Sequence, residues 1–342
     1  MKKLLLSCFV AAATIGCQAD DGKLKVQMDC KHVGDTVLVL GRSSSEKPDT
    51  FVGKQGTFNF EIDVQQPRNI FIAEPGALRG DRSAAVFRVP AIPGEEVVLT
   101  AADRSRYDIT GSTFYTQYHE ADLAIENAQK EGKDVTQAIL DFIKAHPDYE
   151  ASAVIISMLG NYDTMKQAVD LLSPAVRDGR CKQIYQDVLA QAEAQKKADE
   201  EAAKKQAVGI EAPDFTLNDL DGKPLSLASL RGKHVILDFW GSWCGWCIKG
   251  IPQMKEYYTK YQGKFEILGI DCNDTDQKWR DAVKKYELPW LHVYNPRESS
   301  VLKDYGIQGF PTKIIVGPDG KIVKTIVGED PAFYTLLDEL FQ

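Results

Sequence analysis

The sequence has few cysteines, no excess of basic over acidic residues and few long apolar runs. Its 342 residues include only seven cysteines, too few for a scaffold built on disulfides. The formal net charge of −8 argues against nucleic-acid binding, because proteins that bind phosphate backbones present an excess of Lys and Arg. Beyond the first residues, no apolar run is long enough for a transmembrane helix. The length and the 44% hydrophobic fraction predict two or three globular domains.

Cys244 and Cys247 form a CxxC pair that has no second pair to accompany it. A structural zinc site needs two more ligands at suitable spacing, and no histidine closely follows this pair. We therefore expect no metal and no organic cofactor. The two interpretations that remain are a redox-active pair and a structural disulfide.

The other five cysteines are not paired in this way. Cys8 and Cys17 lie in the N-terminal segment, whereas Cys30, Cys181 and Cys272 are isolated in the sequence. Isolated cysteines are usually small buried side chains. We expect this of the last three, to which the sequence assigns no role.

The CxxC pair lies where a predicted strand gives way to a predicted helix. Residues 235–240 are an apolar strand that contains one acid, and residues 248–261 favour a helix. Only a thiolate attacks a disulfide, and the N-terminus of a helix stabilises an anion. Cys244 is therefore the predicted nucleophile. Cys247, one turn further along, can resolve the mixed disulfide that forms.

The segments around this pair resemble the thioredoxin family, and in particular its membrane-associated TlpA/ResA relatives. The thioredoxin-like active-site segments are 237–240 and 243–247. The TlpA/ResA-like segments upstream are 212–215, 221–222 and 230–233, and residues 309–312 match the cis-proline loop. The dipeptide between the cysteines is Gly-Trp, where thioredoxin has Gly-Pro. The resemblance covers about residues 209–342 and implies a thioredoxin-like α/β domain.

Alternation along the strand places Asp238 inward, beneath the cysteines. Burial raises the pKa of a carboxyl group there, and the group can then take the proton of Cys247. The matching thioredoxin position has this role; the alternative is a structural acid held by a hydrogen bond. An apolar residue near Ile267 replaces the lysine that accompanies this acid in many thioredoxins. Gly250 stands where ResA-type relatives carry a glutamate.

The resemblance also implies a surface that binds an extended substrate chain. Pro311 matches the cis-proline of the family, which leaves the backbone of Phe310 free to pair with a substrate. Trp243 and Trp246 are expected to form an apolar rim beside Cys244. The alternative for both tryptophans is packing against the domain.

Residues 1–16 resemble a bacterial lipoprotein signal peptide. Two lysines precede an apolar run that is too short to span a bilayer, and Gly-Cys follows it. Cys17 is the predicted lipidation site, although Thr14 replaces a commoner leucine. Cys8 fits the same pattern with almost no apolar run before it, and an ordinary secretory signal is the alternative. Each version exports the protein, and lipidation anchors it to a membrane.

The chain between this signal and the thioredoxin-like domain is predicted to form two regions. In residues 23–111, short alternating apolar stretches punctuated by Gly and Pro predict a small antiparallel sandwich or barrel. This region resembles the β domain that precedes thioredoxin-like domains in Bacteroides-type envelope proteins. In residues 112–207 we expect short helices followed by an exposed helix from about Ala190. That last helix is either a semi-rigid spacer or the end of a packed helix.

The predicted fold is thus multidomain, with an all-β sandwich-like domain, a central α-helical region and an α/β thioredoxin-like domain at residues 208–342. The predicted function is that of a thiol–disulfide oxidoreductase acting on protein disulfides in the cell envelope, facing the periplasm. The resemblance favours reduction, with electrons from a membrane thiol donor. The alternatives are a thiol peroxidase, whose Pro-xxx-Thr/Ser-xx-Cys pattern is absent, and a non-enzymatic binding or scaffold protein.

Overall fold

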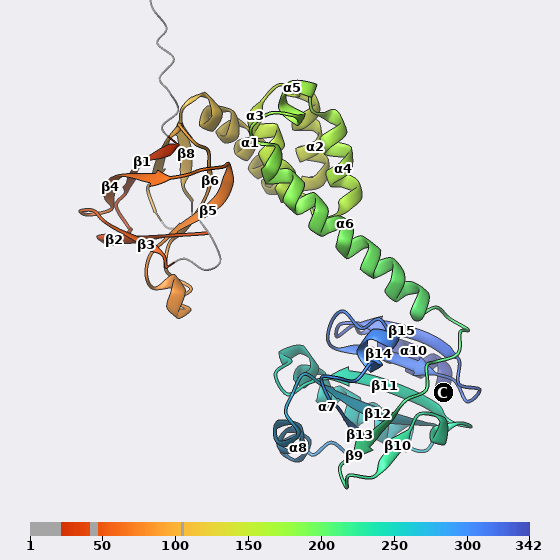
Figure 1. Cartoon of the computed structure of the whole chain (residues 1–342). Helices are drawn as coiled ribbons and strands as arrows, with labels where there is room; N and C mark the ends of the chain where they lie inside the picture. The colour runs from red at the N-terminus through yellow and green to blue at the C-terminus, as the bar shows by residue number, and fades with distance from the viewer. Residues whose placement is uncertain (1–21, 42–46, 104–105) are drawn as a thin grey trace, which may run out of the picture. The chain divides into compact units, whose positions relative to one another are not determined.

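The computed structural model describes residues 22–41, 47–103 and 106–342. The chain forms two compact units, and the division falls between Glu193 and Ala194 (Figure 1). The predicted signal peptide and the predicted lipidation site at Cys17 lie outside the described residues. Within the described ranges, no helix combines the length and the apolar character needed to cross a membrane.

In its described part, the first unit begins with eight strands in two four-stranded sheets (Figure 1). One sheet has the order β4 (Thr57–Asp63), β1 (Lys23–Cys30), β7 (Glu96–Ala101), β8 (Asp108–Gly111). The other has the order β3 (Asp49–Val52), β2 (Thr36–Leu40), β5 (Arg68–Ala73), β6 (Val86–Ala91), and a short 3₁₀ helix, η1 (Ala77–Arg79), precedes β6.

The two sheets bury their alternating apolar side chains in one shared core, as the sandwich-like prediction requires. Leu24 and Val26 of β1 pack in the same cluster as Val37 of β2 and Ile70 of β5. The expectation of a wholly antiparallel arrangement was wrong, because β1 pairs with β7 in parallel. Alternation shows which face of a strand is buried, but it does not show which strand lies next to it.

Helices follow the strands in the first unit and share the same core. They are α1 (Thr113–Lys130), α2 (Val135–Ala145), α3 (Glu150–Ile155) with η2 (Ile156–Met158), α4 (Tyr162–Leu171), α5 (Pro174–Arg177) and the start of α6 (Lys182–Lys205). The N-terminus of α2 is capped by Asp134, whose Oδ1 accepts a hydrogen bond from the Thr136 amide at 2.8 Å. This helix ends at Ala145, directly before His146 and Pro147.

Helix α6 is packed at its start and exposed over most of its length. Its first turns bury Ile184 and Tyr185, whereas the later turns are largely exposed. Just beyond its end, the side chain of Gln206 donates a hydrogen bond of 2.9 Å to the carbonyl of Tyr305. The last part of the helix is thereby attached to the second unit, to which residues from 194 onward belong.

The second unit is built on a seven-stranded mixed sheet (Figure 1). Its order is β10 (Pro224–Ser226), β9 (Thr216–Asp219), β13 (Leu291–Asn295), β12 (Phe265–Cys272), β11 (His234–Trp240), β14 (Thr312–Val316), β15 (Ile322–Val327). Strand β11 is central, runs parallel to β12 and is antiparallel to β14. The strand predicted at residues 235–240 is present as part of β11, and β13 was not predicted.

Helices cover one face of this sheet, and loops with a short helix cover the other. On the first face, side chains of α7 (Gly245–Lys260), α8 (Asp276–Lys285) and α10 (Ala332–Phe341) pack against Ile236, Ile267 and Ile315. The second face packs against the segment around Ala212, the 3₁₀ helix η3 (Ala228–Leu230) and α9 (Val301–Asp304), which the sequence did not predict. The residues of β11 therefore alternate between these two layers.

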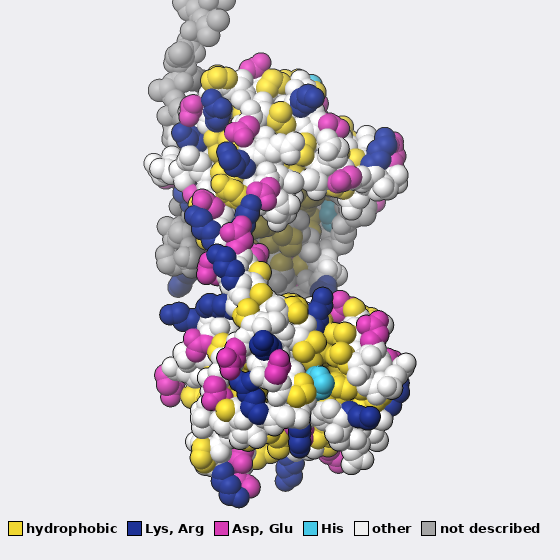
Figure 2. All heavy atoms as spheres, turned by 90° about the vertical axis from the view of Figure 1, so that its right-hand side faces the viewer, with side chains coloured by type: hydrophobic (Ala, Val, Ile, Leu, Met, Phe, Trp, Pro, Cys, Tyr) yellow, Lys and Arg dark blue, Asp and Glu magenta, His cyan; other side chains and the backbone are white. Residues whose placement is uncertain are grey.

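Figure 2 shows one face of the chain. Over its described residues, acidic and basic side chains are interspersed rather than separated into areas of one sign. Hydrophobic side chains gather over part of the surface of the second unit in this view.

Candidate active site

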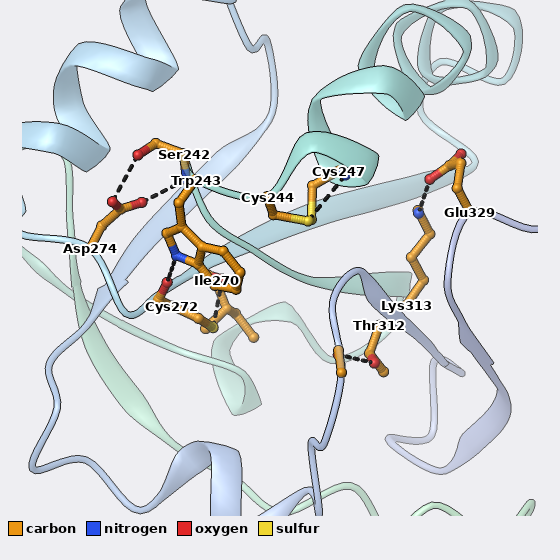
Figure 3. The surroundings of a disulfide bond; sticks show 11 residues. Ser242, Trp243, Cys244, Cys247, Ile270, Cys272, Asp274, Thr312, Lys313 and Glu329 are labelled. Atoms are coloured by element: carbon orange, nitrogen blue, oxygen red, sulfur yellow. Dashed lines mark hydrogen bonds and ion pairs between the residues drawn. A yellow bond between two sulfur atoms is a disulfide. The ribbon is translucent and has the colours of Figure 1, made fainter. Parts of the chain in front are cut away.

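The cysteine pair lies at the start of α7, directly after the central strand (Figure 3). Cys244 is the N-cap of the helix, and its Sγ accepts a hydrogen bond of 3.2 Å from the Cys247 amide. The two residues form a disulfide and are 5% and 7% exposed. The first turn of a helix has unpaired N–H groups, so these donors can stabilise a thiolate at Cys244.

The turn between β11 and Cys244 is held by the indole of Trp243. Its Nε1 donates a hydrogen bond of 2.9 Å to the carbonyl of Cys272 at the end of β12. The indole approaches so closely that a Cβ on Gly241 would lie 2.4 Å from this nitrogen. Glycine at position 241 is therefore required for the turn, and it brings the end of β12 against the active-site loop.

A second attachment of the same loop was not predicted from the sequence. Asp274 accepts hydrogen bonds from the amide and the hydroxyl of Ser242, at 2.6 and 2.7 Å. Behind it lies Asp271, which is fully buried; burial, and then the neighbouring Asp274, raise the pKa of its carboxyl group to about 9. Asp271 is thus protonated at neutral pH, so its carboxyl group adds no charge beside the acceptor of the two Ser242 donors.

Two of the predicted substrate-binding side chains, Trp243 and Trp246, lie next to the cysteines in the sequence. Trp243 and Trp246 are 52% and 62% exposed, although the first also packs edge-on against Phe310 at 5.3 Å between ring centroids. Lys249 lies over the ring of Trp246. An open groove of about 570 Å³ begins at Ser242 and Trp243; the residues that line it further on are Asn273, Asp274, Lys278, Asp281, Ala282, Lys285 and Tyr286.

The peptide bond between Phe310 and Pro311 is cis, as predicted. Thr312 follows, and its hydroxyl donates to the carbonyl of Gly309 at 2.8 Å. The loop leads directly into β14, which pairs with β11. Pro311 therefore lies on the strand that neighbours the one ending at the cysteines.

Asp238 is buried on the helix-covered face of β11. It is 6% exposed, and the residues two positions before and after it, Ile236 and Trp240, pack in the same cluster as Cys244 and Cys247. Burial raises the pKa of its carboxyl group to about 6, an effect that Lys313 opposes and Glu329 reinforces. This places the titration of Asp238 within reach of neutral pH.

The lysine beside Asp238 was missed in the sequence. Position 267 holds the apolar residue that was predicted, but Lys313 lies directly opposite Asp238 across β11 and β14. Its Nζ is 2.8 Å from Oε2 of Glu329. In Figure 3 this ion pair and the group formed by Ser242, Trp243 and Asp274 lie on opposite sides of the cysteine pair. A lysine two residues after the proline, in an otherwise apolar strand, is the signal that identifies it.

The three isolated cysteines are buried and unpaired, as predicted. Burial raises the pKa of the Cys30 thiol to about 11 and that of Cys181 to about 12, and it raises that of Cys272 further. None of these thiols is ionised at neutral pH. In the described ranges, no group of three or more His, Cys, Asp or Glu side chains is arranged to hold a metal ion.

The cysteine pair lies at the N-terminus of a helix that follows the central strand of a mixed sheet. A cis-proline loop leads into the neighbouring strand. This arrangement defines a thioredoxin-like site. Such a site exchanges dithiol and disulfide. The fold and the site therefore place the second unit among the thioredoxin-like proteins.

Comparison with known proteins narrows this class. A profile of the AhpC/TSA family matches residues 208–325. The ResA thiol–disulfide oxidoreductase of Bacillus thuringiensis is 39% identical over 127 residues, which are 37% of this chain and 73% of that protein. The ResA protein of Bacillus subtilis is 33% identical over 121 residues, or 35% of this chain and 67% of that protein.

Among solved structures, the thioredoxin domain of a thiol–disulfide oxidoreductase from Bacteroides vulgatus is 33% identical, with a TM-score of 0.37. The match covers 39% of this chain and 98% of that one.

Through its C-terminal part, the chain belongs to the family of ResA-like thiol–disulfide oxidoreductases. It is a thiol–disulfide oxidoreductase, and its Cys244 and Cys247 form a disulfide.

Proposed function

We propose that the protein reduces disulfides of exported proteins, with Cys244 as the nucleophile. The observation that carries this role is the position of its sulfur at the N-cap of α7, where it accepts the amide of Cys247. The Cys244 thiolate attacks one sulfur of the substrate disulfide, and the other substrate sulfur leaves as a thiolate that takes a proton from water. A mixed disulfide between Cys244 and the substrate remains.

Cys247 completes the reaction. Its S–H bond breaks, the proton passes to the carboxylate of Asp238, and the new thiolate attacks the sulfur of Cys244. The mixed disulfide breaks, and the second substrate thiolate leaves with the electron pair and is protonated. Each substrate disulfide is thereby reduced to two thiols while Cys244 and Cys247 become a disulfide. A thiol donor must reduce this pair before the next cycle.

An extended segment of a protein substrate is the proposed ligand. The exposed rings of Trp243 and Trp246 offer apolar surface beside Cys244, and Phe310 packs next to the first of them. The backbone at Phe310 and Pro311 is proposed to pair with the substrate strand.

The remaining assignments concern location. In this proposal the chain is lipid-anchored through Cys17, faces the periplasm and receives electrons from a thiol donor in the membrane. Residues 208–342 form the catalytic domain. Residues 23–111 form a β domain and residues 112–207 a helical region.

The direction of the reaction is tested by the reduction potential of the Cys244/Cys247 pair, measured by equilibration with glutathione or dithiothreitol buffers. A value near ~−270 mV or lower is expected for a reductase. A value of ~−120 to −180 mV contradicts the proposed direction and indicates oxidation or isomerisation. Turnover of hydroperoxides in place of disulfides contradicts the substrate class.

The roles of the two cysteines are tested separately. The Cys247→Ser variant is expected to accumulate a mixed disulfide with a substrate, because it attacks but cannot resolve. The Cys244→Ser variant is expected to form none. Trapping through position 247 instead of 244 overturns the assignment of the nucleophile.

A further inference from the structure

The active site contains a buried ion pair that the proposed reaction does not yet use. Lys313 faces Asp238 directly across β11 and β14. Its Nζ lies 2.8 Å from Oε2 of Glu329, and the two side chains are 2% and 15% exposed. Removing two charges from water costs free energy that a pair only partly recovers, so such a pair is weak evidence for a stabilising role.

Glu329 also lies against the helix that carries the cysteines. Its carboxylate fills the space over Gly250, three residues after Cys247: a Cβ built on Gly250 would lie 2.4 Å from Oε2. The hydroxyl of Tyr334 donates to Oε1 at 2.9 Å and lies 3.4 Å from the carbonyl oxygen of Gly250. Only glycine at position 250 leaves room for this carboxylate, so Gly250 and Glu329 fit each other.

We infer that Lys313 and Glu329 are positioning residues that set the proton affinity of Asp238, and through it the ionisation of Cys247 during exchange. This inference rests on the proposed role of Asp238 as the proton acceptor. The geometry that carries it has three parts. Lys313 pairs with Asp238 across β11 and β14, its Nζ forms the ion pair with Glu329, and the Glu329 carboxylate lies against α7 at Gly250.

The two residues act on Asp238 with opposite sign. When Asp238 is protonated, the cluster is neutral, because Lys313 and Glu329 cancel. When Asp238 ionises, the positive charge of Lys313 stabilises the new carboxylate and the negative charge of Glu329 opposes it. Glu329 therefore prevents Lys313 from holding Asp238 permanently ionised, and the carboxyl group stays able to accept and to release a proton.

Other groups near Asp238 are neutral at physiological pH. Tyr334 of α10 and Cys272 of β12 both interact electrostatically with Asp238, and burial raises the pKa of both well above the ordinary values. The remaining ionisable neighbour is the redox pair itself on α7, with Cys247 as the group whose proton is transferred. The charged groups that set the proton affinity of Asp238 are thus Lys313 and Glu329.

The test uses the full chain and compares Glu329→Gln with Lys313→Met. The pKa of Asp238 is followed by the carboxyl carbon signal in NMR, and the rate at which Cys247 resolves a preformed mixed disulfide is followed against pH. Asp338→Asn serves as a matched control, because Asp338 forms a similar cluster with Lys260, Tyr257 and Tyr261 elsewhere in this unit.

The expected changes are opposite. In Glu329→Gln the pKa of Asp238 falls, and the pH profile of resolution moves to lower pH. In Lys313→Met the pKa and the profile both move to higher pH. At a pH well below both the old and the new pKa, the ionised fraction of Asp238 then falls about tenfold when its pKa rises by about 1. Asp338→Asn moves neither. Changes of the same sign in both variants, or none in Glu329→Gln, overturn the inference.

A transplant variant keeps the test decisive if Lys313→Met does not fold. Glu329→Ala with Gly250→Glu returns a carboxylate to the same space from the helix side, and it is expected to restore the profile that Glu329→Ala alone moves. Failure to restore it contradicts the inference. The proposed function fails on a different result: Asp238→Asn that resolves the mixed disulfide at the wild-type rate and with the wild-type pH profile.

Discussion

Asp238 is an acidic residue in an apolar strand, and its buried surroundings determine the pKa of its carboxyl group. Its Oδ1 has no hydrogen-bond partner within the described protein, so burial disfavours the charged form without compensation from a donor. A group in this state is a poor stabiliser and a good proton acceptor. The same residue is therefore expected to lower stability and to assist exchange.

Replacing Asp238 with Asn is expected to stabilise the protein at neutral pH and to slow resolution by Cys247. The pKa of Asp238 is about 6 in the folded state, above the ordinary ~3.9 of the unfolded chain. The folded state therefore binds the proton more tightly, and the stability that this proton supplies at low pH is lost as the pH rises from about 4 to about 6. Above that range the variant gains roughly 3 kcal/mol over the wild type.

The measurement is denaturant unfolding of both proteins at pH 4, 5, 6 and 7.5. The difference in free energy of unfolding between them is expected to grow with pH and then level off. A difference that stays constant over the whole range would show that Asp238 does not titrate as described.

At the scale of elements, the connection from β11 to α7 determines where the cysteines lie. It is held from β12 by two contacts, the Trp243 indole on the Cys272 carbonyl and the Asp274 carboxylate on Ser242. Both contacts depend on the end of β12 reaching the loop. The position of Cys244 is therefore set by a neighbouring strand as well as by its own helix.

Gly241→Ala is expected to displace the Trp243 indole and to lower the free energy of unfolding by about 2 kcal/mol, because the added Cβ overlaps Nε1 and the Cys272 carbonyl. Gly245→Ala is the matched control. Its Cβ meets nothing within 4 Å, and alanine favours the helix by up to ~1 kcal/mol. Denaturant unfolding and tryptophan fluorescence measure both effects; equal losses in the two variants would contradict this account of the loop.

Asp274→Ala is expected to cost about 2–4 kcal/mol of stability, because the amide and hydroxyl of Ser242 lose a charged acceptor. It also removes the second cause of the raised pKa of Asp271, so that pKa is expected to fall from about 9. Asp271→Asn is the comparison, since it leaves the hydrogen bonds of Ser242 in place. If Asp271→Asn destabilises the protein as much as Asp274→Ala, the contacts of Ser242 are not the cause.

Periodicity and motifs predicted the strands around the cysteines and Cys244 as the start of a helix, because those signals are local. They missed β13, whose Leu291–Asn295 segment is short and carries a histidine, and the four-residue α9. The parallel pairing of β1 with β7 was missed for another reason, since the strands are separated by most of the sandwich. The interaction partners of the site residues were the hardest feature of the site to predict. Gly250 was noted as an absent side chain, but nothing local shows that Glu329 fills its place.

At the scale of the whole molecule, the chain forms two compact units that differ in their content of tryptophan, a fluorescence reporter of unfolding. All five tryptophans, at positions 240, 243, 246, 279 and 290, belong to the second unit. The hydrophobic cores formed by the described residues are likewise separate, with one in the first unit and two on the faces of the second unit's sheet. Separate cores allow separate unfolding.

Denaturant unfolding is therefore expected to show two transitions by circular dichroism and one by tryptophan fluorescence. Ile72→Ala removes a fully buried side chain from the first unit and Ile236→Ala one from the second. Each is expected to cost about 2–5 kcal/mol. The first should leave the fluorescence transition unchanged, whereas the second should move it to lower denaturant. If the two variants move both transitions together, the units unfold as one, and residues 22–193 contribute directly to the stability of the redox domain.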